Sequence, residues 1–144
     1  MSNFRFGSRS EDNLRGVHSE LVNVVRLALL ISNTDFAVIE GLRTERRQHD
    51  LYAQGRSKPG PIVTWTLASK HITGDAVDLL PINPETAKPD WNYKAGFQEV
   101  HDAMFAAADR LDVKIRWGAD WNMNGKAGEK GETDTPHFEL VKVA

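Results

Sequence analysis

The chain has 144 residues, 40% of them hydrophobic, and a formal net charge of −2. This length predicts a single domain, spanning residues 1–144, and the small negative charge argues against a general nucleic-acid binder. The sequence has no cysteine, which excludes disulfides, thiolate metal sites and cysteine nucleophiles, so a metal would have to be held by His, Asp or Glu.

No apolar run approaches the length of a membrane span, and the first residues do not follow the charged-then-apolar pattern of a signal peptide. We therefore expect a monomeric protein that is made in the cytoplasm and does not insert into a membrane.

The first third of the chain predicts a long helix followed by a strand. Ser10 is expected to cap a helix with acidic residues in its first turn. Apolar residues then recur at spacings of three and four up to Ile31. His18 lies beside this stripe, so we expect a surface or hydrogen-bonded histidine and not a ligand. The apolar run 36–39 predicts a short strand.

The next segment, G-L-R-T-E-R-R-Q at residues 41–48, predicts a short helix capped by Thr44 and ended near Gly55. Its basic residues could form an ordinary solvated face. Arg43, however, precedes the cap at a strand-to-helix junction, where a side chain can project into a cleft. The planar fork of arginine suits recognition of a carboxylate.

After a loop at 55–61, residues 62–67 predict a β-like approach to S-K-H-I-T-G-D-A-V-D-L-L-P at residues 69–81. Asp78 falls within an apolar run that is typical of a buried strand. A carboxylate there must be paired or bound to a metal, because burying a lone charge is costly. His71 and Asp78 could equally be a turn histidine and a strand-end aspartate that hold a loop together.

The remaining elements complete a mixed architecture. Residues 83–91, with two prolines, are expected to form a loop, and the apolar spacing from Phe97 to Leu111 predicts a second amphipathic helix. Residues 113–117 and 138–143 have strand character. We expect an α+β fold with helices packed on a mainly antiparallel sheet.

A second imidazole, His137, stands at the start of the last predicted strand. With His71 and Asp78 it makes a two-histidine, one-carboxylate set, which suits catalytic zinc with a fourth position open for water. Asp134, three residues earlier, is well placed to be a general base acting on that water.

These residues lie in two motifs, S-x-H-x-x-G-x-A-x-D and D-x-P-H-F-E, which together resemble the M15 zinc peptidases. The resemblance implies Zn²⁺ bound by His71, Asp78 and His137, Asp134 as the base, and the compact fold shared with the hedgehog signalling domain. The G-x-R-[TS]-x-x-R-Q pattern is similar to the same family, which implies that Arg43 and Gln48 line the substrate cleft. Ser69 either hydrogen-bonds the substrate or caps its turn.

Within this family, the segments G-L-R-T, A-V-D-L-L-P and R-W-G-A-D-W resemble the phage endolysins. That branch cleaves the bond between L-alanine and D-glutamate in peptidoglycan stem peptides and so causes lysis of the host. A protein of this kind, made in the host cytoplasm, would need a separate factor to reach the cell wall. The alternatives are a D-Ala-D-Ala carboxypeptidase or dipeptidase, and a non-catalytic zinc-containing binding domain of the hedgehog kind.

A further motif lies between the two halves of the metal site. Asp120, Asn122 and Asn124, with glycine at the sixth position and Lys126 at the seventh, match the opening of an EF-hand calcium loop. Position twelve is Gly131 and not glutamate, so the match is incomplete. The alternative is a Gly- and Asn-rich turn between two strands. Some phage endolysins carry a calcium site in this loop, and the resemblance therefore leaves Ca²⁺ open as a second ion beside the plain turn.

Overall fold

The computed structural model describes residues 2–64, 69–120, 123 and 134–141. Helices and strands follow in the order α1 (Ser8–Leu14), α2 (Ser19–Ile31), β1 (Phe36–Glu40), α3 (Glu45–Ala53), β2 (Ala76–Asn83), β3 (Lys88–Pro89), α4 (Lys94–Leu111), β4 (Ile115–Trp117) and β5 (His137–Leu140). None of these helices is long and apolar enough to cross a membrane.

The strands form one sheet in the order β1-β2-β5-β4, with β3 paired to β2, and every pair of named strands is antiparallel. Strands β2 and β5 are neighbours in this sheet, and Asp78 lies opposite His137. These two residues are 59 positions apart in the sequence. The expected α+β class with an antiparallel sheet is confirmed, and the sheet brings the two halves of the motif together.

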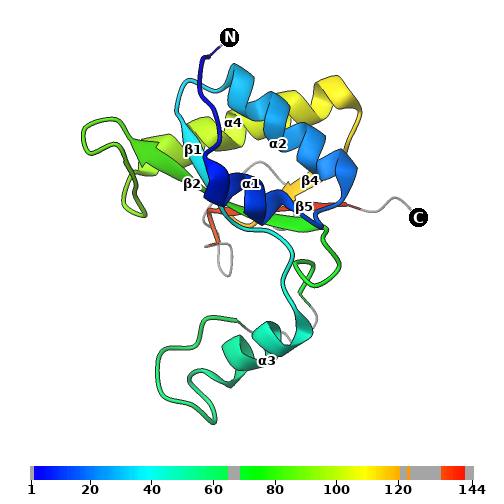
Figure 1. Cartoon of the computed structure of the whole chain (residues 1–144), viewed down its shortest axis with the longest axis vertical. Coiled ribbons are helices and arrows are strands. Elements are labelled where there is room, and N and C mark those ends of the chain that lie inside the picture. Colours follow the sequence, from blue (N-terminus) through cyan, green and yellow to red (C-terminus); the bar gives the residue numbers. More distant parts are fainter. Residues whose placement is uncertain (1, 65–68, 121–122, 124–133, 142–144) are drawn as a thin grey trace.

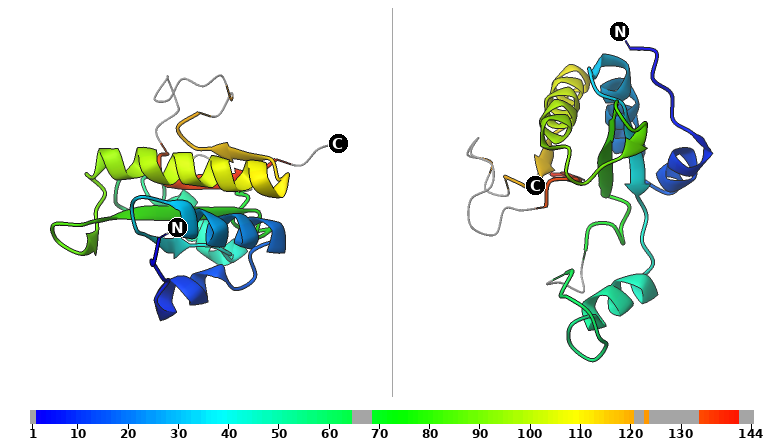
Figure 2. Two further views of the ribbon diagram at one scale, coloured as in Figure 1. Left: turned by 90° about the horizontal axis from the view of Figure 1, so that it is seen from above. Right: turned by 90° about the vertical axis from the view of Figure 1, so that its left-hand side faces the viewer.

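The core lies between the sheet and two helices. Figures 1 and 2 show α2 and α4 packed side by side over one face of the sheet, while α1 lies against β1. Because side chains alternate along a strand, Val77 and Leu79 of β2 and Phe138 of β5 enter this core. The intervening residues, Asp78 and His137, therefore project from the opposite face.

The single helix expected from Ser10 to Ile31 is wrong, because the chain breaks after Leu14. Gly16 has φ +80, and His18 caps α2 by accepting a hydrogen bond from the backbone N–H of Glu20 at its Nδ1. The expectation of a hydrogen-bonded histidine at position 18 is confirmed. Ser10 is not a cap either: it is buried inside α1, where its hydroxyl accepts a hydrogen bond from the Val38 N–H.

The loop expected at 83–91 contains the short strand β3, which pairs Lys88 with Asn83 and Pro89 with Ile82. Asn83 shapes the turn, since its side-chain oxygen accepts the Glu85 N–H. Proline is tolerated in β3 because the strand lies at the edge of the sheet and needs no further donor.

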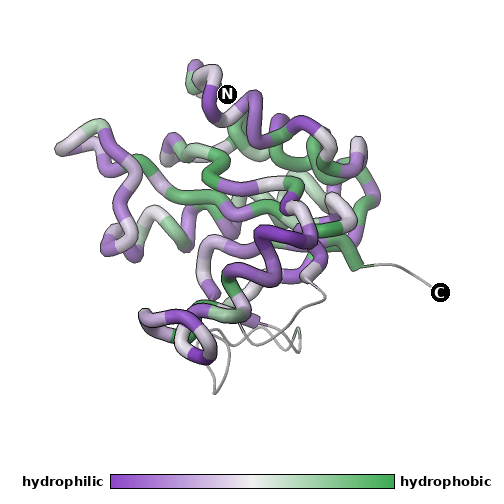
Figure 3. Tube along the Cα trace, turned by 60° about the horizontal axis from the view of Figure 1, so that its bottom comes forward, coloured by the Kyte–Doolittle hydropathy of each residue, from purple (hydrophilic) through white to green (hydrophobic). Residues whose placement is uncertain are grey.

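Helix α3 stands apart from the layers of the sheet and the other helices (Figures 1 and 2). Thr44 caps it, as predicted, by accepting the Arg47 N–H. Its residues are strongly hydrophilic (Figure 3), and Gln48 is its one buried residue. Of the β-like segment predicted at 62–67, residues 62–64 are irregular and the others lie outside the described residues.

Candidate metal centre

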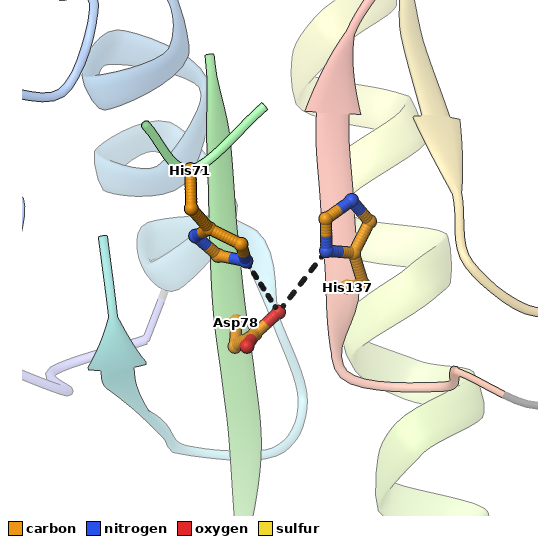
Figure 4. Close-up of side chains that lie close together, drawn as sticks. All are labelled: His71, Asp78 and His137. Carbon is orange, nitrogen blue, oxygen red and sulfur yellow. Dashed lines mark hydrogen bonds and ion pairs between the residues drawn. The ribbon is translucent and has the colours of Figure 1, made fainter. Parts of the chain in front are cut away.

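Three side chains from separate segments meet on the sheet face opposite the helices. Asp78 comes from β2, His137 from β5, and His71 from the turn that precedes β2 (Figure 4). The Oδ1 atom of Asp78 lies 3.2 Å from Nε2 of His71 and 3.3 Å from Nδ1 of His137. One ligand atom from each residue lies within 4.8 Å of the others, and no other such group occurs among the described residues. The three predicted ligands are thus brought together.

The turn at 69–75 holds His71 in place before β2. Backbone hydrogen bonds run from Ile72 N to Ser69 O and from Asp75 N to Lys70 O. Gly74 has φ +78, and a Cβ atom there would lie 2.5 Å from the Gly16 carbonyl oxygen, so both backbone conformation and space require glycine. The Ser69 hydroxyl accepts the His71 N–H, which is the turn-capping role of the two that the sequence left open.

Each histidine uses one ring nitrogen for a protein contact and leaves the other facing Asp78. Nδ1 of His71 lies 2.8 Å from the carbonyl oxygen of Gly41. Because a carbonyl can only accept, Nδ1 carries the proton, and Nε2 is the nitrogen that faces Asp78. This ring is 2% exposed, so its orientation is fixed by burial as well.

In His137 the roles of the two ring nitrogens are exchanged relative to His71. Its Nε2 lies 2.9 Å from Oε1 of Glu139, and Nδ1 is the nitrogen that faces Asp78. Glu139 is itself paired with Lys70, whose Nζ lies 2.9 Å from Oε2 and also donates to the Leu140 carbonyl at 2.7 Å. Outer partners of this kind fix the tautomer and orientation of metal-binding histidines.

The sequence reasoning missed Glu139 and Lys70 as partners of the ligands. One signal was available for Glu139: it stands two residues after His137 on a strand, so both side chains lie on the same face. No comparable signal exists for Gly41, which is 30 residues from the histidine that it orients.

The charges of the cluster favour a bound cation. Burial opposes ionisation of Asp78, but hydrogen bonds from His137 and His71 hold the pKa of this carboxyl well below its usual range. Burial also opposes charge on His137, yet hydrogen bonds to Asp78 and Glu139 outweigh it and raise the pKa of His137 to about 9. The site thus stabilises positive charge between these groups, where a metal would replace the proton.

Two imidazole nitrogens and one carboxylate oxygen, each pointing toward the others, fit the donor set of a catalytic metal site that keeps one position open. Both histidines have their second nitrogen satisfied by the protein.

Asp134 lies beside the three candidate ligands, on the side that is open to solvent. Its Oδ2 is 3.9 Å from Nδ1 of His137, and its side chain is 52% exposed. Partial burial and the nearby charge of Asp78 raise the pKa of Asp134, while the positive groups around it act in the opposite direction. A carboxylate beside the donor set, accessible to solvent and with a raised pKa, can exchange a proton with water.

Arg43 and Gln48, both predicted to line the substrate cleft, contact each other, and the guanidinium of Arg43 is already hydrogen-bonded within the protein. Its Nε and Nη2 atoms donate to the two carboxylate oxygens of Glu40 at 2.7 and 2.6 Å, and Nη1 donates to Gln48 Oε1 at 2.6 Å. Gln48 is fully buried and also contacts Thr64. Three of the five guanidinium N–H groups are therefore used within the protein.

Of the predicted calcium-loop residues, only Asp120 is described: its N–H donates to the Trp117 carbonyl and its own carbonyl accepts the Met123 N–H. Asn122, Asn124 and Lys126 lie outside the described residues.

Two histidines and one carboxylate on the sheet of an α+β domain, with a further acid beside them, define the class of metal-dependent hydrolases with an open coordination position. Comparison with known proteins narrows this class. The family model for phage L-alanyl-D-glutamate peptidases matches residues 1–141, and the chain belongs to this family. The predicted membership of the phage endolysin branch is thereby confirmed.

Individual relatives agree with the family. The chain is 40% identical over 142 residues to the L-alanyl-D-glutamate peptidase of Escherichia phage T5, covering 96% of this chain and 98% of that protein. It is 26% identical over 132 residues to the peptidoglycan L-alanyl-D-glutamate endopeptidase CwlK of Bacillus subtilis (strain 168), covering 90% and 74%.

Solved structures show the same fold. The L-Ala D-Glu endopeptidase ChiX of Serratia marcescens matches with a TM-score of 0.75 and 34% identity, covering 96% of this chain and 92% of that one. The vancomycin-resistance D,D-dipeptidase VanXYg matches with a TM-score of 0.53 and 20% identity, covering 87% and 50%. At that identity it shows only the shared fold, and the predicted D-Ala-D-Ala-peptidase-like architecture is confirmed.

Proposed function

We propose that the chain is a zinc-dependent endolysin that hydrolyses the L-Ala–D-Glu bond of peptidoglycan stem peptides. The observation that carries this proposal is the convergence of His71 Nε2, Asp78 Oδ1 and His137 Nδ1 beside the carboxylate of Asp134. Membership of the phage L-alanyl-D-glutamate peptidase family supports the choice of bond.

His71, Asp78 and His137 would hold the zinc ion. When bound, zinc supplies Lewis acidity, which polarises the scissile carbonyl and lowers the pKa of a coordinated water. Asp134 accepts the proton of the attacking water and then donates it to the amino group of the departing D-glutamate. The raised pKa of Asp134 suits a group that must both take up and release a proton.

In this proposal Arg43 lines the approach to the site, and Gln48, predicted as a substrate contact but fully buried, supports Arg43 by accepting a hydrogen bond from its Nη1. Glu40 holds the guanidinium in one orientation, and two N–H groups remain beyond those that donate to Glu40 and Gln48. These would bind a substrate carboxylate or stabilise the negative charge that develops on the carbonyl oxygen. Ser69, with its hydroxyl on the His71 N–H, would contact substrate only through its remaining hydrogen-bonding capacity.

We also propose that the 120–126 segment binds calcium through Asp120, Asn122, Asn124 and the backbone at Lys126. The support is the sequence match to the opening of an EF-hand loop. Activity would then require calcium in addition to zinc. With zinc held fixed, a calcium-selective chelator should lower the rate and millimolar calcium should restore it. If the rate is the same with chelator and with added calcium, the segment is a turn that does not bind calcium. The same conclusion follows if Asp120→Ala has the wild-type rate under both conditions.

Residues 1–144 would act as one monomeric catalytic domain, made in the host cytoplasm and reaching the cell wall after release by a separate factor. Its partner there would be the stem peptide itself.

Digestion of purified peptidoglycan, followed by mass spectrometry and end-group analysis, tests the proposal. New N-terminal D-glutamate is the expected product, and Asp134→Asn, which should form it much more slowly, is the matched control. Release of D-alanine or D-Ala-D-Ala would instead identify a carboxypeptidase or dipeptidase. Absence of cleavage by metal-loaded protein would identify a binding domain.

A further inference from the structure

Trp117 and Gly118, at the centre of the R-W-G-A-D-W segment, end β4 directly beside the turn that carries Asp134 and His137. Trp117 is paired with Phe138 across the sheet, and its indole Nε1–H donates to the Thr135 carbonyl at 2.7 Å. We propose that Trp117 is a positioning residue, which fixes the Asp134 carboxylate beside the metal ligands. This inference rests on the proposed function, in which Asp134 is the base.

All four backbone carbonyls from Asp134 to His137 accept a hydrogen bond, and only one of the four donors is a side chain. The acceptors and donors are Asp134 O with His137 N (3.2 Å), Thr135 O with Trp117 Nε1 (2.7 Å), Pro136 O with Leu79 N (2.9 Å) and His137 O with Gly118 N (2.8 Å). Three of the donors belong to the backbone and cannot be removed without changing the chain itself. The indole N–H is the one donor that a side-chain substitution removes.

The indole cannot turn to another partner. Trp117 is 5% exposed, and its ring centroid lies 4.3 Å from that of His101 and 6.4 Å from that of Phe138, with the Trp117 and Phe138 planes 16° apart. A buried indole that contacts other rings has little freedom to rotate, and its N–H needs a partner within the protein. The hydrogen bond to Thr135 is therefore fixed by the core and does not depend on the solvent-exposed surface.

Gly118 brings the end of β4 into contact with Asp134 itself. The Asp134 N–H donates to the Gly118 carbonyl at 3.2 Å. A Cβ atom at Gly118 would lie 2.1 Å from the Asp134 carbonyl oxygen and 2.9 Å from its Cβ. Glycine is required here by this close approach of two backbones.

Among the described residues, no group makes a hydrogen bond to the carboxylate of Asp134. Its side chain is 52% exposed, and within the described residues its one ion-pair contact is the 3.9 Å approach to His137 Nδ1. Its position is thus set mainly by the backbone of the turn, which Trp117 and Gly118 fix from one side. Misplacing a catalytic group by about 1 Å can lower a rate by about 10²-fold.

The test is Trp117→Phe, which keeps an aromatic ring against Phe138 but removes the N–H. We expect kcat to fall by at least roughly tenfold, with KM and the bound metal per chain unchanged. Trp91→Phe, the same change at a site that is 60% exposed, should leave kcat unaltered. Phe36→Leu, which removes core volume from β1, should lower the melting temperature without lowering kcat. Wild-type kcat in Trp117→Phe would overturn the inference.

A double-mutant cycle with Asp134→Asn separates positioning from general destabilisation. If Trp117 acts through Asp134, Trp117→Phe should cause no further loss of kcat in the Asp134→Asn background. An equal loss in both backgrounds would overturn the inference while leaving Asp134 as the base. Wild-type kcat in Asp134→Asn alone would refute the proposed base, and this inference with it.

Gly118→Ala gives a second test that leaves the Trp117 ring intact, in case Trp117→Phe does not fold. The added methyl group must displace Asp134, so kcat should fall with the metal retained and again without additivity toward Asp134→Asn. A fully active Gly118→Ala protein would contradict the inference.

Discussion

Glu139→Ala should weaken metal binding although Glu139 lies outside the donor set. The substitution removes the acceptor for Nε2 of His137, 2.9 Å away, and the partner of Lys70 at 2.9 Å. The side chains of His137 and Glu139 are 8% and 7% exposed, so water has little access to replace the lost acceptor. The neutral ring can then carry its proton on Nδ1, which blocks the nitrogen that faces Asp78.

Loss of such an outer partner typically costs 10- to 100-fold in metal affinity. This corresponds to about 1.4 to 2.8 kcal/mol. We expect Glu139→Ala to fall within that range because its acceptor is buried and charged.

Competition against a chromogenic chelator, with zinc added to the metal-free protein, measures the effect. Glu139→Gln is the matched variant: its amide oxygen still accepts from Nε2, but it cannot neutralise Lys70, so its affinity should lie between those of Glu139→Ala and the wild type. Glu85→Ala, at an exposed turn, controls for loss of an acidic residue elsewhere. Wild-type affinity in Glu139→Ala would refute the role of this contact.

Three further predictions concern the ligands, the cleft and pH. Alanine at His71, Asp78 or His137 should abolish metal binding and turnover together, whereas Asp134→Ala should keep about one metal per chain and lose roughly 10²-fold or more in turnover; metal analysis that finds zinc retained in His137→Ala would refute the ligand assignment. Arg43→Lys should raise KM and lower the melting temperature, because lysine cannot replace the fork that binds Glu40, and wild-type kinetics would place Arg43 outside the cleft. In the metal-free protein the pKa of His137 is raised from 6.5 to about 9. Its contribution to stability should thus be full below pH 6.5 and be lost as pH rises through about 9, and a melting temperature constant between these values would contradict it.

The ligands could be predicted from the sequence because their spacing reflects local structure. The turn from Ser69 to Gly74 and the strand that follows place His71 and Asp78 on one side of the sheet, and these features need only neighbouring residues. The pairing of Asp78 with His137 is long-range. The sequence suggested it through the chemistry that a shared metal requires and through the resemblance of the two motifs to the M15 zinc peptidases.

The partners of the ligands could not be predicted in the same way. Gly41 and His71 meet across 30 positions, and nothing in either residue type marks the contact. Arg43 illustrates a different difficulty. Its position suggested an available guanidinium, but the end of β1 presents Glu40 three residues earlier, and the two charges pair.

The secondary-structure prediction was wrong where a tertiary contact outweighed the local sequence pattern. The apolar stripe runs without interruption past Leu14, yet the chain leaves the helix so that the His18 N–H can reach the Gly74 carbonyl at 2.8 Å. That contact joins the start of α2 to the turn that holds His71. The helix break is therefore part of the support for the metal site.

Diffraction from zinc-loaded crystals, with data collected on both sides of the zinc absorption edge, tests the central claim most directly. We expect one anomalous peak within bonding distance of Nε2 of His71, Nδ1 of His137 and the carboxylate of Asp78, with the Gly41 carbonyl and Glu139 still on the opposite ring nitrogens. A peak bound through Nδ1 of His71 or Nε2 of His137, or a peak away from these three residues, would contradict the account.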